Sequence, residues 1–276
     1  MKEVLQKTAE NNDELHGRLD PVAFDQYIQF ATHSPPADLA LFIDHFWVLR
    51  WDEEGAGYTS EQVMHRPYVD IFVSSTESGI QGTFRGKRIY KTTESGSGRI
   101  VGARFRPGAF HAFWDGEMAD LQDKNIDITH AFPRADTQYI DRIVGLNDQA
   151  AIQELIALIR ARRPQLDANI ELINKIITAA ENDEELLTVA AVAKASGRSE
   201  RWLQQLFSDY VGVGLKWLLQ RHKLLIAAQR IRENDQPDWV AIAYDSGYSS
   251  QQHFITDFKR VLDKTPLQYK KELTTP

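Results

Sequence analysis

The chain has 276 residues, of which 42% are hydrophobic and 26% charged, with a formal net charge of −7 and no cysteine. This length and composition fit two globular domains and exclude fibrous and disordered chains. The lack of cysteine excludes disulfides, a thiol nucleophile and a cysteine-bound zinc site. The sequence contains no run of about eighteen apolar residues, the length that spans a membrane, and its start Met1-Lys2-Glu3-Val4 is unlike a secretion signal. We therefore expect a cytoplasmic protein with no membrane partner.

The N-terminal half is predicted to consist mainly of β-strands. Residues 1–15 are expected to be disordered, and a short helix is predicted from Asp20-Pro21 to about Phe30. Apolar alternation predicts six strands, at 39–51, 57–64, 68–74, 81–84, 87–92 and 99–105. Turn residues concentrate in 52–60 and 76–98, which we expect to be mobile loops. Short strands joined by such turns favour a small barrel or sandwich.

Helices are predicted to follow the strands. One starts at Pro107-Gly108 and runs through Phe113, and two more are expected near 137–144 and 149–162. Arg163-Pro164 comes next and is interpreted as a domain boundary. We therefore expect an N-terminal domain of residues 1–163 and a C-terminal domain of residues 164–276.

Four side chains of the N-terminal half are candidates for a small-molecule site. Arg104 and Arg106 are two apart on one expected strand, so they should face the same side, and their guanidinium groups suit an anion. Trp47 and His65 are assigned to the same site. An alternative role for one or both arginines is to fix the strand-to-helix turn by donating to main-chain carbonyls.

Three histidines of this half are alternative candidates for metal ligands, namely His45, His65 and His111. Their spacing does not favour this role, because no His-x-His pair is followed by a nearby carboxylate. The chain also has no phosphate loop, no Gly-x-Ser-x-Gly elbow and no dinucleotide fingerprint. We therefore predict no metal, no cofactor and no catalytic residue.

The C-terminal half contains one motif twice. Ala191 to Gly197 reads AVAKASG, and Ala241 to Gly247 reads AIAYDSG. Each glycine can take the left-handed backbone conformation of a tight turn between helices, and a second amphipathic helix follows it. Serine is a good residue to begin such a helix, at Ser199 in the first copy and at Ser249 or Ser250 in the second. The pattern predicts two helix-turn-helix units, at 188–210 and 238–260.

The second helix of each unit has a polar face opposite its apolar one. Arginine pairs with guanine and glutamine with adenine in the major groove, which has room for one helix, so we interpret these faces as base-reading surfaces. An ordinary solvated helix surface is the alternative. The first face is expected to hold Arg201, Gln204, Gln205 and Ser208, and the second Gln251, Gln252, His253, Thr256 and Lys259.

A single long helix from Leu215 to about Glu233 is predicted to join the two units. At 1.5 Å per residue it would be roughly 28 Å long, close to the roughly 34 Å between successive major-groove faces of one duplex. One chain could therefore occupy two successive turns of DNA.

The charge of the C-terminal half is balanced, because Lys and Arg are as numerous as Asp and Glu from Ala168 onward. Phosphate neutralisation supplies much of the affinity of any DNA-binding protein, so its cations must be concentrated locally. The candidates are Lys194, Arg198, Arg201, Lys216, Arg221, Lys259 and Arg260. We expect weak nonspecific binding.

These C-terminal residues resemble the AraC/XylS family of bacterial transcription regulators. The strongest match is Gly247-Tyr248-Ser249-Ser250-Gln251-Gln252-His253-Phe254, continued by Phe258-Lys259-Arg260, Thr265-Pro266 and Tyr269. The first unit matches through Ser199-Glu200-Arg201-Trp202-Leu203, Phe207 and Gly212. The chain departs from the family pattern at Gly214-Leu215, Lys223, Thr256 and Asp263.

The N-terminal half resembles a domain found on one branch of AraC-like regulators. The matching stretches are Val101 to Gly108, His45-Phe46-Trp47 and Arg66 to Asp70. The resemblance implies a cupin-like sensor barrel, and therefore an α+β chain with an all-α C-terminal domain.

Together, these observations lead us to expect a sequence-specific regulator of transcription that binds double-stranded DNA and is controlled by a small molecule. RNA polymerase is a further candidate partner, and either a monomer or a homodimer fits the sequence. The alternative hypothesis is a metal-dependent or hydrolytic enzyme of the cupin-like barrel with a helical regulatory appendage.

Overall fold

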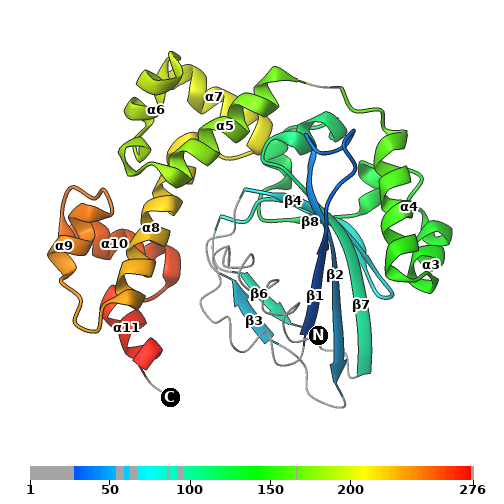
Figure 1. The fold of residues 1–276 in the computed structure, drawn as a ribbon, viewed down its shortest axis with the longest axis horizontal. Helices are drawn as coiled ribbons and strands as arrows, with labels where there is room; N and C mark the ends of the chain where they lie inside the picture. The colour runs from blue at the N-terminus through cyan, green and yellow to red at the C-terminus, as the bar shows by residue number, and fades with distance from the viewer. Residues whose placement is uncertain are drawn as a thin grey trace. The chain divides into compact units, whose positions relative to one another are not determined.

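The computed structural model describes residues 28–53, 59–62, 67–85, 88–91, 96–165 and 167–274 (Figure 1). Two compact units are present. The first, here called the β unit, extends to Asn174 and includes Ser208–Gly212, and the second, the helical unit, comprises Lys175–Phe207 and Val213–Pro276. The division falls inside one helix, so the domain boundary at residue 163 stays a prediction. The α+β class is confirmed.

The β unit is built on a six-stranded antiparallel sheet with the strand order β1-β2-β7-β4-β5-β8. A separate two-stranded antiparallel sheet pairs β3 with β6. The bounds are β1 Ile28–His33, β2 Ile43–Glu53, β3 Thr59–Gln62, β4 Val69–Ser74, β5 Ser78–Gln81, β6 Arg88–Lys91, β7 Gly96–Phe105 and β8 Asn125–Ile126. The β-rich half predicted from the sequence thus forms two antiparallel sheets.

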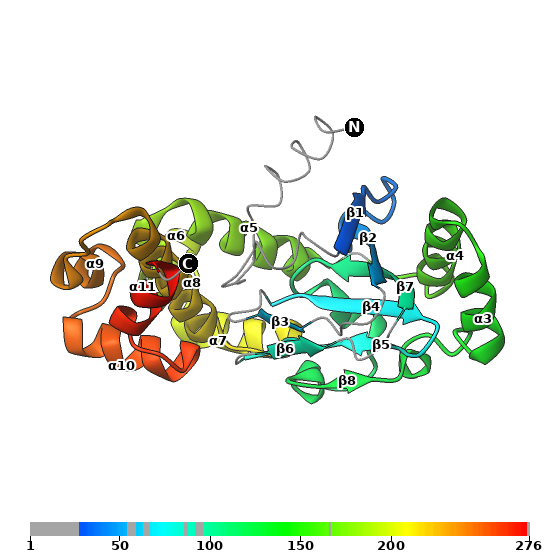
Figure 2. The same ribbon diagram turned by 90° about the horizontal axis from the view of Figure 1, so that it is seen from below.

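Helices cover one side of the six-stranded sheet, and the β3–β6 pair lies on the other side (Figures 1 and 2). The helices of the β unit are the 3₁₀ helices η1 Ala109–Phe113, η2 Met118–Leu121 and η3 Ile128–His130, and the α-helices α3 Thr137–Gly145 and α4 Asp148–Ala161. The two α-helices confirm the predictions for 137–144 and 149–162.

The core of the β unit lies between the sheet and these helices. Side chains alternate along a strand, so Phe46 and Val48 of β2 share a face with Ala103 of β7. All three are buried in one cluster with Leu155 and Ile159 of α4. The opposite face of the sheet therefore carries the residues between them, His45 and Trp47 of β2 and Arg104 of β7.

Three of the predicted elements of this half were wrong in position. The residues before Ile28 lie outside the described chain, but the end of the helix expected to Phe30 is part of strand β1. The strand expected from Leu39 begins at Ile43, because Leu39 to Phe42 form a turn in which Phe42 N donates to Leu39 O at 2.9 Å. The strand expected at 81–84 is β5 at 78–81, and the helix at 109–113 is a 3₁₀ helix.

The shift of β5 has a local cause. Ser74 and Glu77 close a tight turn, in which Ser74 N donates to Glu77 O at 2.8 Å and the Ser74 hydroxyl accepts from Glu77 N at 3.0 Å. Strand pairing therefore begins at Ser78 of β5, opposite Val73 of β4.

The helical unit contains the elements predicted for the C-terminal half. Its bounds are α5 Ala168–Asn182, η4 Glu184–Leu186, α6 Val189–Ser196, α7 Glu200–Val211, α8 Leu215–Glu233, α9 Trp239–Asp245, α10 Gln251–Leu262 and α11 Pro266–Thr274. Helices α5 and α7 each contribute residues to both compact units, and α7 is described here with the helical unit. The single long helix expected between the two motifs is α8, with Leu218, Leu224, Ala227 and Ile231 buried along it. Among the residues described, no helix combines the length and apolar character needed to cross a membrane.

Candidate nucleic-acid interface

Both motif glycines have the backbone conformation that the sequence predicted. Gly197 follows α6 with φ 66°, and Gly247 follows α9 with φ 78°. This left-handed region is unfavourable for residues with a Cβ atom, whereas glycine enters it freely. Each glycine therefore lets the chain turn sharply from the first helix of its unit into the second.

Serine begins each second helix. The Ser199 hydroxyl accepts a hydrogen bond from Trp202 N at 3.2 Å, and the Ser250 hydroxyl accepts one from His253 N at 3.2 Å. These bonds satisfy backbone N–H groups that have no partner inside the first turn of a helix. The prediction of an N-cap at Ser199 is confirmed, and Ser250 is the N-cap of the second copy.

The polar face of α7 is solvent-exposed at Arg201, Gln205 and Ser208, while Leu203 and Phe207 are buried on the other side. Gln204 is only partly exposed. Its carbonyl oxygen Oε1 accepts from Lys216 N at 3.5 Å, at the first turn of α8. Gln204 is therefore directed toward the start of α8.

Trp202 is an exposed aromatic residue on α7 that the sequence reading missed. Its side chain is 37% exposed, and the Arg198 guanidinium lies over the indole ring, 4.9 Å from its centre. The spacing of three residues between Trp202 and Gln205 places both on one stripe of the helix. The spacing alone would have placed Trp202 on the exposed face, but a tryptophan in an amphipathic helix is more often part of the core.

The polar face of α10 is exposed at Gln252, His253, Thr256 and Lys259, and Gln251 is half-buried. The Thr256 hydroxyl donates to the main-chain carbonyl of Gln252 at 2.8 Å. The Gln252 amide in turn lies 3.5 Å from the Thr256 hydroxyl. The His253 ring packs edge-on against Tyr248, with 5.4 Å between the ring centres.

Helices α7 and α10 lie on the same side of the helical unit in Figure 2. The buried helix α8 connects their units along the chain. Arg201 and Gln205 of α7 thus belong to the same compact unit as the exposed residues of α10, as contacts with two neighbouring parts of one DNA duplex would require.

A buried polar network connects the second helix-turn-helix unit to α8. The carboxylate of Asp257 on α10 is buried and accepts from the Tyr248 hydroxyl at 3.1 Å, from the Gln220 amide of α8 and from Arg260. Burial is the main reason that the pKa of Tyr248 is raised, and the Asp257 charge adds to the effect. Lys223 of α8 donates to the carbonyl of Gly247 at 2.7 Å, and its partial burial lowers its pKa.

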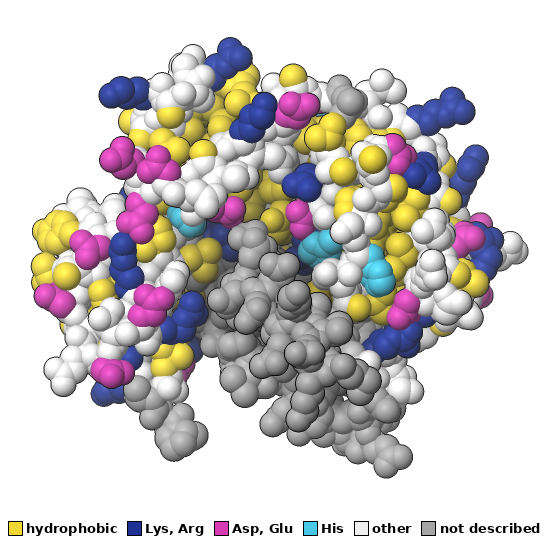
Figure 3. Space-filling model, viewed as in Figure 1, with side chains coloured by type: hydrophobic (Ala, Val, Ile, Leu, Met, Phe, Trp, Pro, Cys, Tyr) yellow, Lys and Arg dark blue, Asp and Glu magenta, His cyan; other side chains and the backbone are white. Residues whose placement is uncertain are grey.

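The cation list drawn from the sequence needs one correction. Arg221 is 5% exposed, because it lies on the buried side of α8, so it is not positioned to meet DNA phosphates from solvent. The other cations of that list are exposed: Lys194, Arg198, Arg201, Lys216, Lys259 and Arg260. Figure 3 shows basic and acidic side chains mixed over the visible face of the helical unit, in keeping with the balanced charge of this part of the sequence.

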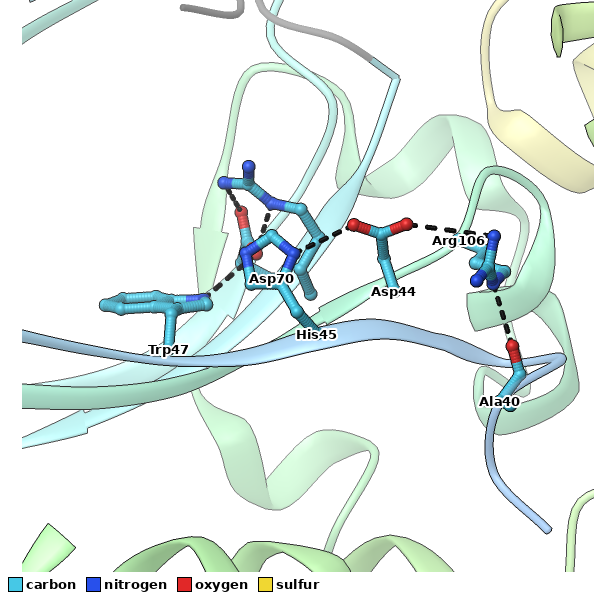
Figure 4. Close-up of polar contacts among 7 residues, drawn as sticks. Ala40, Asp44, His45, Trp47, Asp70 and Arg106 are labelled. Atoms are coloured by element: carbon cyan, nitrogen blue, oxygen red, sulfur yellow. Dashed lines mark hydrogen bonds and ion pairs between the residues drawn. The ribbon is translucent and has the colours of Figure 1, made fainter. Parts of the chain in front are cut away.

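In the β unit, Arg104 forms an ion pair with Asp70 across neighbouring strands. Figure 4 shows Asp70 beside His45 and Trp47. Arg104 Nε and Nη2 donate to the two carboxylate oxygens at 2.9 and 3.0 Å, and Trp47 Nε1 donates to the same carboxylate at 3.3 Å. The Tyr68 ring lies against the guanidinium, 5.3 Å away. The Arg104 charge is therefore already compensated by a buried carboxylate.

Arg106 and His65 are placed differently from Arg104. Strand β7 ends at Phe105, and Arg106 Nε donates to the carbonyl of Ala40 at 2.8 Å, with Nη1 3.7 Å from Asp44. This contact is the carbonyl-bonding role considered as an alternative from the sequence. His65 lies outside the described residues, so its assignment to a ligand site stays a prediction.

His45 donates from Nδ1 to Asp44 at 2.8 Å. Burial opposes ionisation of Asp44, but the hydrogen bond and charge of His45, together with the nearby charges of Arg106 and Arg104, hold its pKa below the usual value. Within the ranges that the structure describes, no three His, Asp or Glu side chains come together as metal ligands.

Two helix-turn-helix units with exposed polar faces on one helical body define a DNA-binding protein. Comparisons agree: a family model described as a helix-turn-helix domain matches residues 192–272, and one described as a domain of unknown function (DUF6597) matches residues 31–127. The regulatory protein SoxS of Salmonella typhimurium is 37% identical over 93 residues, covering 34% of this chain and 86% of SoxS.

Two further similarities extend the comparison. The HTH-type transcriptional regulator GlxA of Rhizobium meliloti is 29% identical over 148 residues, covering 51% of this chain and 44% of GlxA. A solved structure of an AraC-type transcriptional regulator from Chromobacterium violaceum is 25% identical, covering 37% of this chain and 90% of that one, with a TM-score of 0.33. Because the match to SoxS extends over most of that regulator, this chain belongs to the AraC/XylS family of transcription regulators.

Proposed function

We propose that this regulator reads two successive major-groove faces of one asymmetric DNA site, with α7 in the first groove and α10 in the second. The observation that carries the proposal is that α7 and α10 lie on the same side of the helical unit in Figure 2 and that each has exposed polar residues. The α8 rod between the units has 19 residues and is therefore roughly 28 Å long, comparable with the pitch of a duplex.

The proposed roles follow from side-chain chemistry. Arg201 and Gln205 of α7, and Gln252 of α10, are the proposed base readers, because their side chains pair with guanine or adenine edges. Ser208, Gln251, His253 and Thr256 are proposed as supporting contacts in the two grooves. Lys259 near the end of α10, Lys194 of α6 and Arg198 in the turn before α7 are proposed to contact phosphates. Gln204 is proposed to act indirectly, through the start of α8.

The β unit is proposed to control this DNA binding in response to a small molecule. An effector needs a binding free energy difference of only about 1 to 3 kcal/mol between two states of the regulator to change DNA occupancy usefully. RNA polymerase is proposed as a second partner, and the acting form is a monomer or a homodimer in the cytoplasm. The matched relatives are regulators, which favours this role over the enzyme hypothesis.

Binding to a library of genomic fragments at two salt concentrations tests the proposal. Gln205→Ala and Gln252→Ala should reduce the preference between sequences, because each removes a base contact. Lys259→Ala should weaken binding to all sequences alike and reduce its salt dependence, because it removes a phosphate contact. Gln236→Ala, in the exposed loop between α8 and α9, is the matched control and should change neither. Unchanged preference in both base-reader variants would contradict the assignment.

A further inference from the structure

The face of the six-stranded sheet that is turned away from α3 and α4 carries an unusual set of side chains. His45, Trp47 and Trp51 of β2 point to this face, because they alternate with the core residues Phe46 and Val48. Arg104 of β7 lies directly opposite His45 and shares its face. An aromatic surface thus runs along β2 and ends in a polar cluster.

Both indole rings of this face lie directly over glycines of β7. Trp47 is paired in register with Gly102, and Trp51 with Gly98. A Cβ atom on Gly102 would lie 2.4 Å from the Trp47 ring, and one on Gly98 would lie 1.9 Å from the Trp51 ring. Any larger residue would push the indoles away, so the glycines allow the two rings to lie flat along the sheet.

The polar end of this surface does not favour an anion. The guanidinium of Arg104 is bonded through two nitrogens to Asp70, whose side chain is 5% exposed, and Arg106 is directed to Ala40 O and Asp44. A carboxylate ligand would have to displace Asp70 from Arg104 and leave a buried charge without compensation. An uncharged ligand requires no such exchange.

His45 supplies an acceptor in this cluster when its ring is neutral. Its Nδ1 donates to the ionised Asp44, so in the neutral ring Nε2 carries a lone pair and no proton. Nε2 is buried and has no hydrogen-bond partner among the residues that the structure describes. The Nε1 donor of Trp51, farther along the same face, is also buried without such a partner. Buried polar atoms are nearly always hydrogen-bonded, so the buried Nε2 of His45 is an atom that a bound molecule would satisfy.

We propose that this face is the effector site and that it binds an uncharged, planar aromatic molecule which stacks on Trp47 and donates a hydrogen bond, as a phenol does, to Nε2 of His45. The proposal rests on ligand control by the β unit and names its ligand class. Trp51 lies six residues from His45, about 20 Å along the strand, so a small ligand reaches one of the two atoms. The polar groups converge at His45, and the site is assigned there (Figure 4).

Calorimetric titration of the full chain with three probes of similar shape tests the ligand class. The probes are 1-naphthol, which is neutral and donates a hydrogen bond, 1-methoxynaphthalene, which is neutral without a donor, and 1-naphthoate, which is an anion. The proposal predicts that 1-naphthol binds about tenfold more tightly than either of the others, the effect of one buried hydrogen bond. Tightest binding of 1-naphthoate, or no binding of any probe, would overturn it.

Variants then locate the site. His45→Phe should remove the preference for 1-naphthol over 1-methoxynaphthalene, while His45→Gln, which keeps an acceptor, should retain part of it. Trp47→Ala should weaken binding of both. His33→Phe, on the exposed end of β1, is the matched control and should bind like the parent chain. Unchanged discrimination by a folded His45→Phe chain would place the probes elsewhere and refute the assignment.

DNA binding measured with and without 1-naphthol separates this inference from the proposed function. If 1-naphthol binds through His45 but leaves DNA affinity unchanged, the site stands and ligand control by the β unit fails. If DNA affinity responds to a probe in a way that is insensitive to His45 and Trp47, ligand control stands and the site is wrong.

Discussion

Lys223 of α8 donates from its ammonium group to the main-chain carbonyl of Gly247, 2.7 Å away in the turn of the second helix-turn-helix unit. The same side chain lies over the Tyr248 ring, 5.8 Å from its centre. The connecting helix therefore holds the turn that sets the direction of α10. This contact makes α8 more than a spacer, because it fixes the angle at which the second polar face is presented.

Lys223→Met keeps the apolar stem and removes the donor. We expect it to lower the free energy of unfolding by about 1 to 2 kcal/mol, since the Gly247 carbonyl loses a charge-assisted bond. Urea denaturation followed by circular dichroism measures this. Lys194→Met on the exposed surface of α6 is the control, and an equal effect of both substitutions would show that the bond to Gly247 contributes nothing specific.

The stability lost on substitution of Gly197 should depend on how well the new residue tolerates the left-handed conformation, and not on the size of its side chain. A Cβ atom there meets nothing within 4 Å, so the backbone term acts alone. We expect Gly197→Ala to destabilise the chain by about 1 kcal/mol and Gly197→Asn by less, because asparagine tolerates this conformation better. Thermal denaturation measures these changes. Gly145→Ala, at the end of α3 and equally open, is the control and should be neutral or stabilising. Asn and Ala in the reverse order at Gly197 would be inconsistent with this explanation.

Asp257 and Tyr248 should be energetically coupled. Asp257→Ala leaves the buried Tyr248 hydroxyl and the Gln220 amide without their acceptor, and we expect a loss of about 2 to 3 kcal/mol. Tyr248→Phe should cost about 1 kcal/mol alone and much less in the Asp257→Ala background, because the bond is already absent. A double-mutant cycle by denaturation measures the coupling. Additive effects would mean that the hydroxyl and the carboxylate do not interact in solution.

The Asp70–Arg104 pair should be sensitive to removal of one partner and tolerant of removal of both. Asp70→Ala leaves a mostly buried guanidinium unpaired and should cost about 3 to 5 kcal/mol. The double variant Asp70→Val with Arg104→Met should recover most of that loss, because no buried charge remains. Thermal denaturation of the three chains decides the matter, and a double variant as unstable as Asp70→Ala would argue against charge burial as the cause.

The sequence predicted the helical unit well for local reasons. Both turns depend on one glycine each, and both second helices begin at a serine within a few residues of it, so the signals lie within one short window. The length of α8 followed from an uninterrupted helical stretch that ends at Asp235-Gln236-Pro237. The prediction for strand β5 was shifted along the sequence, because the position of this strand depends on pairing with β4 across a turn closed by the Ser74 hydroxyl.

The candidate sites were harder to predict because their partners are distant in the sequence. The spacing of Arg104 and Arg106 predicted a shared anion site, but Asp70 is 34 residues from Arg104 and only strand pairing brings them together. The direction of Gln204 depends on Lys216, which reaches it only because α8 starts beside α7. Exposure on a helix can be inferred from periodicity, whereas the use of a side chain as a cap for the next helix cannot.

The central claim is that α7 and α10 occupy two successive grooves of one site, and the spacing of their base contacts tests it most directly. Binding selection from a randomised duplex, followed by sequencing, should be carried out with the parent chain, Gln205→Ala and Gln252→Ala. We predict that each variant loses preference at its own group of positions and that the two groups are about 10 to 10.5 base pairs apart, one turn of the duplex. Loss of preference at the same positions in both variants, or at none, would contradict the account.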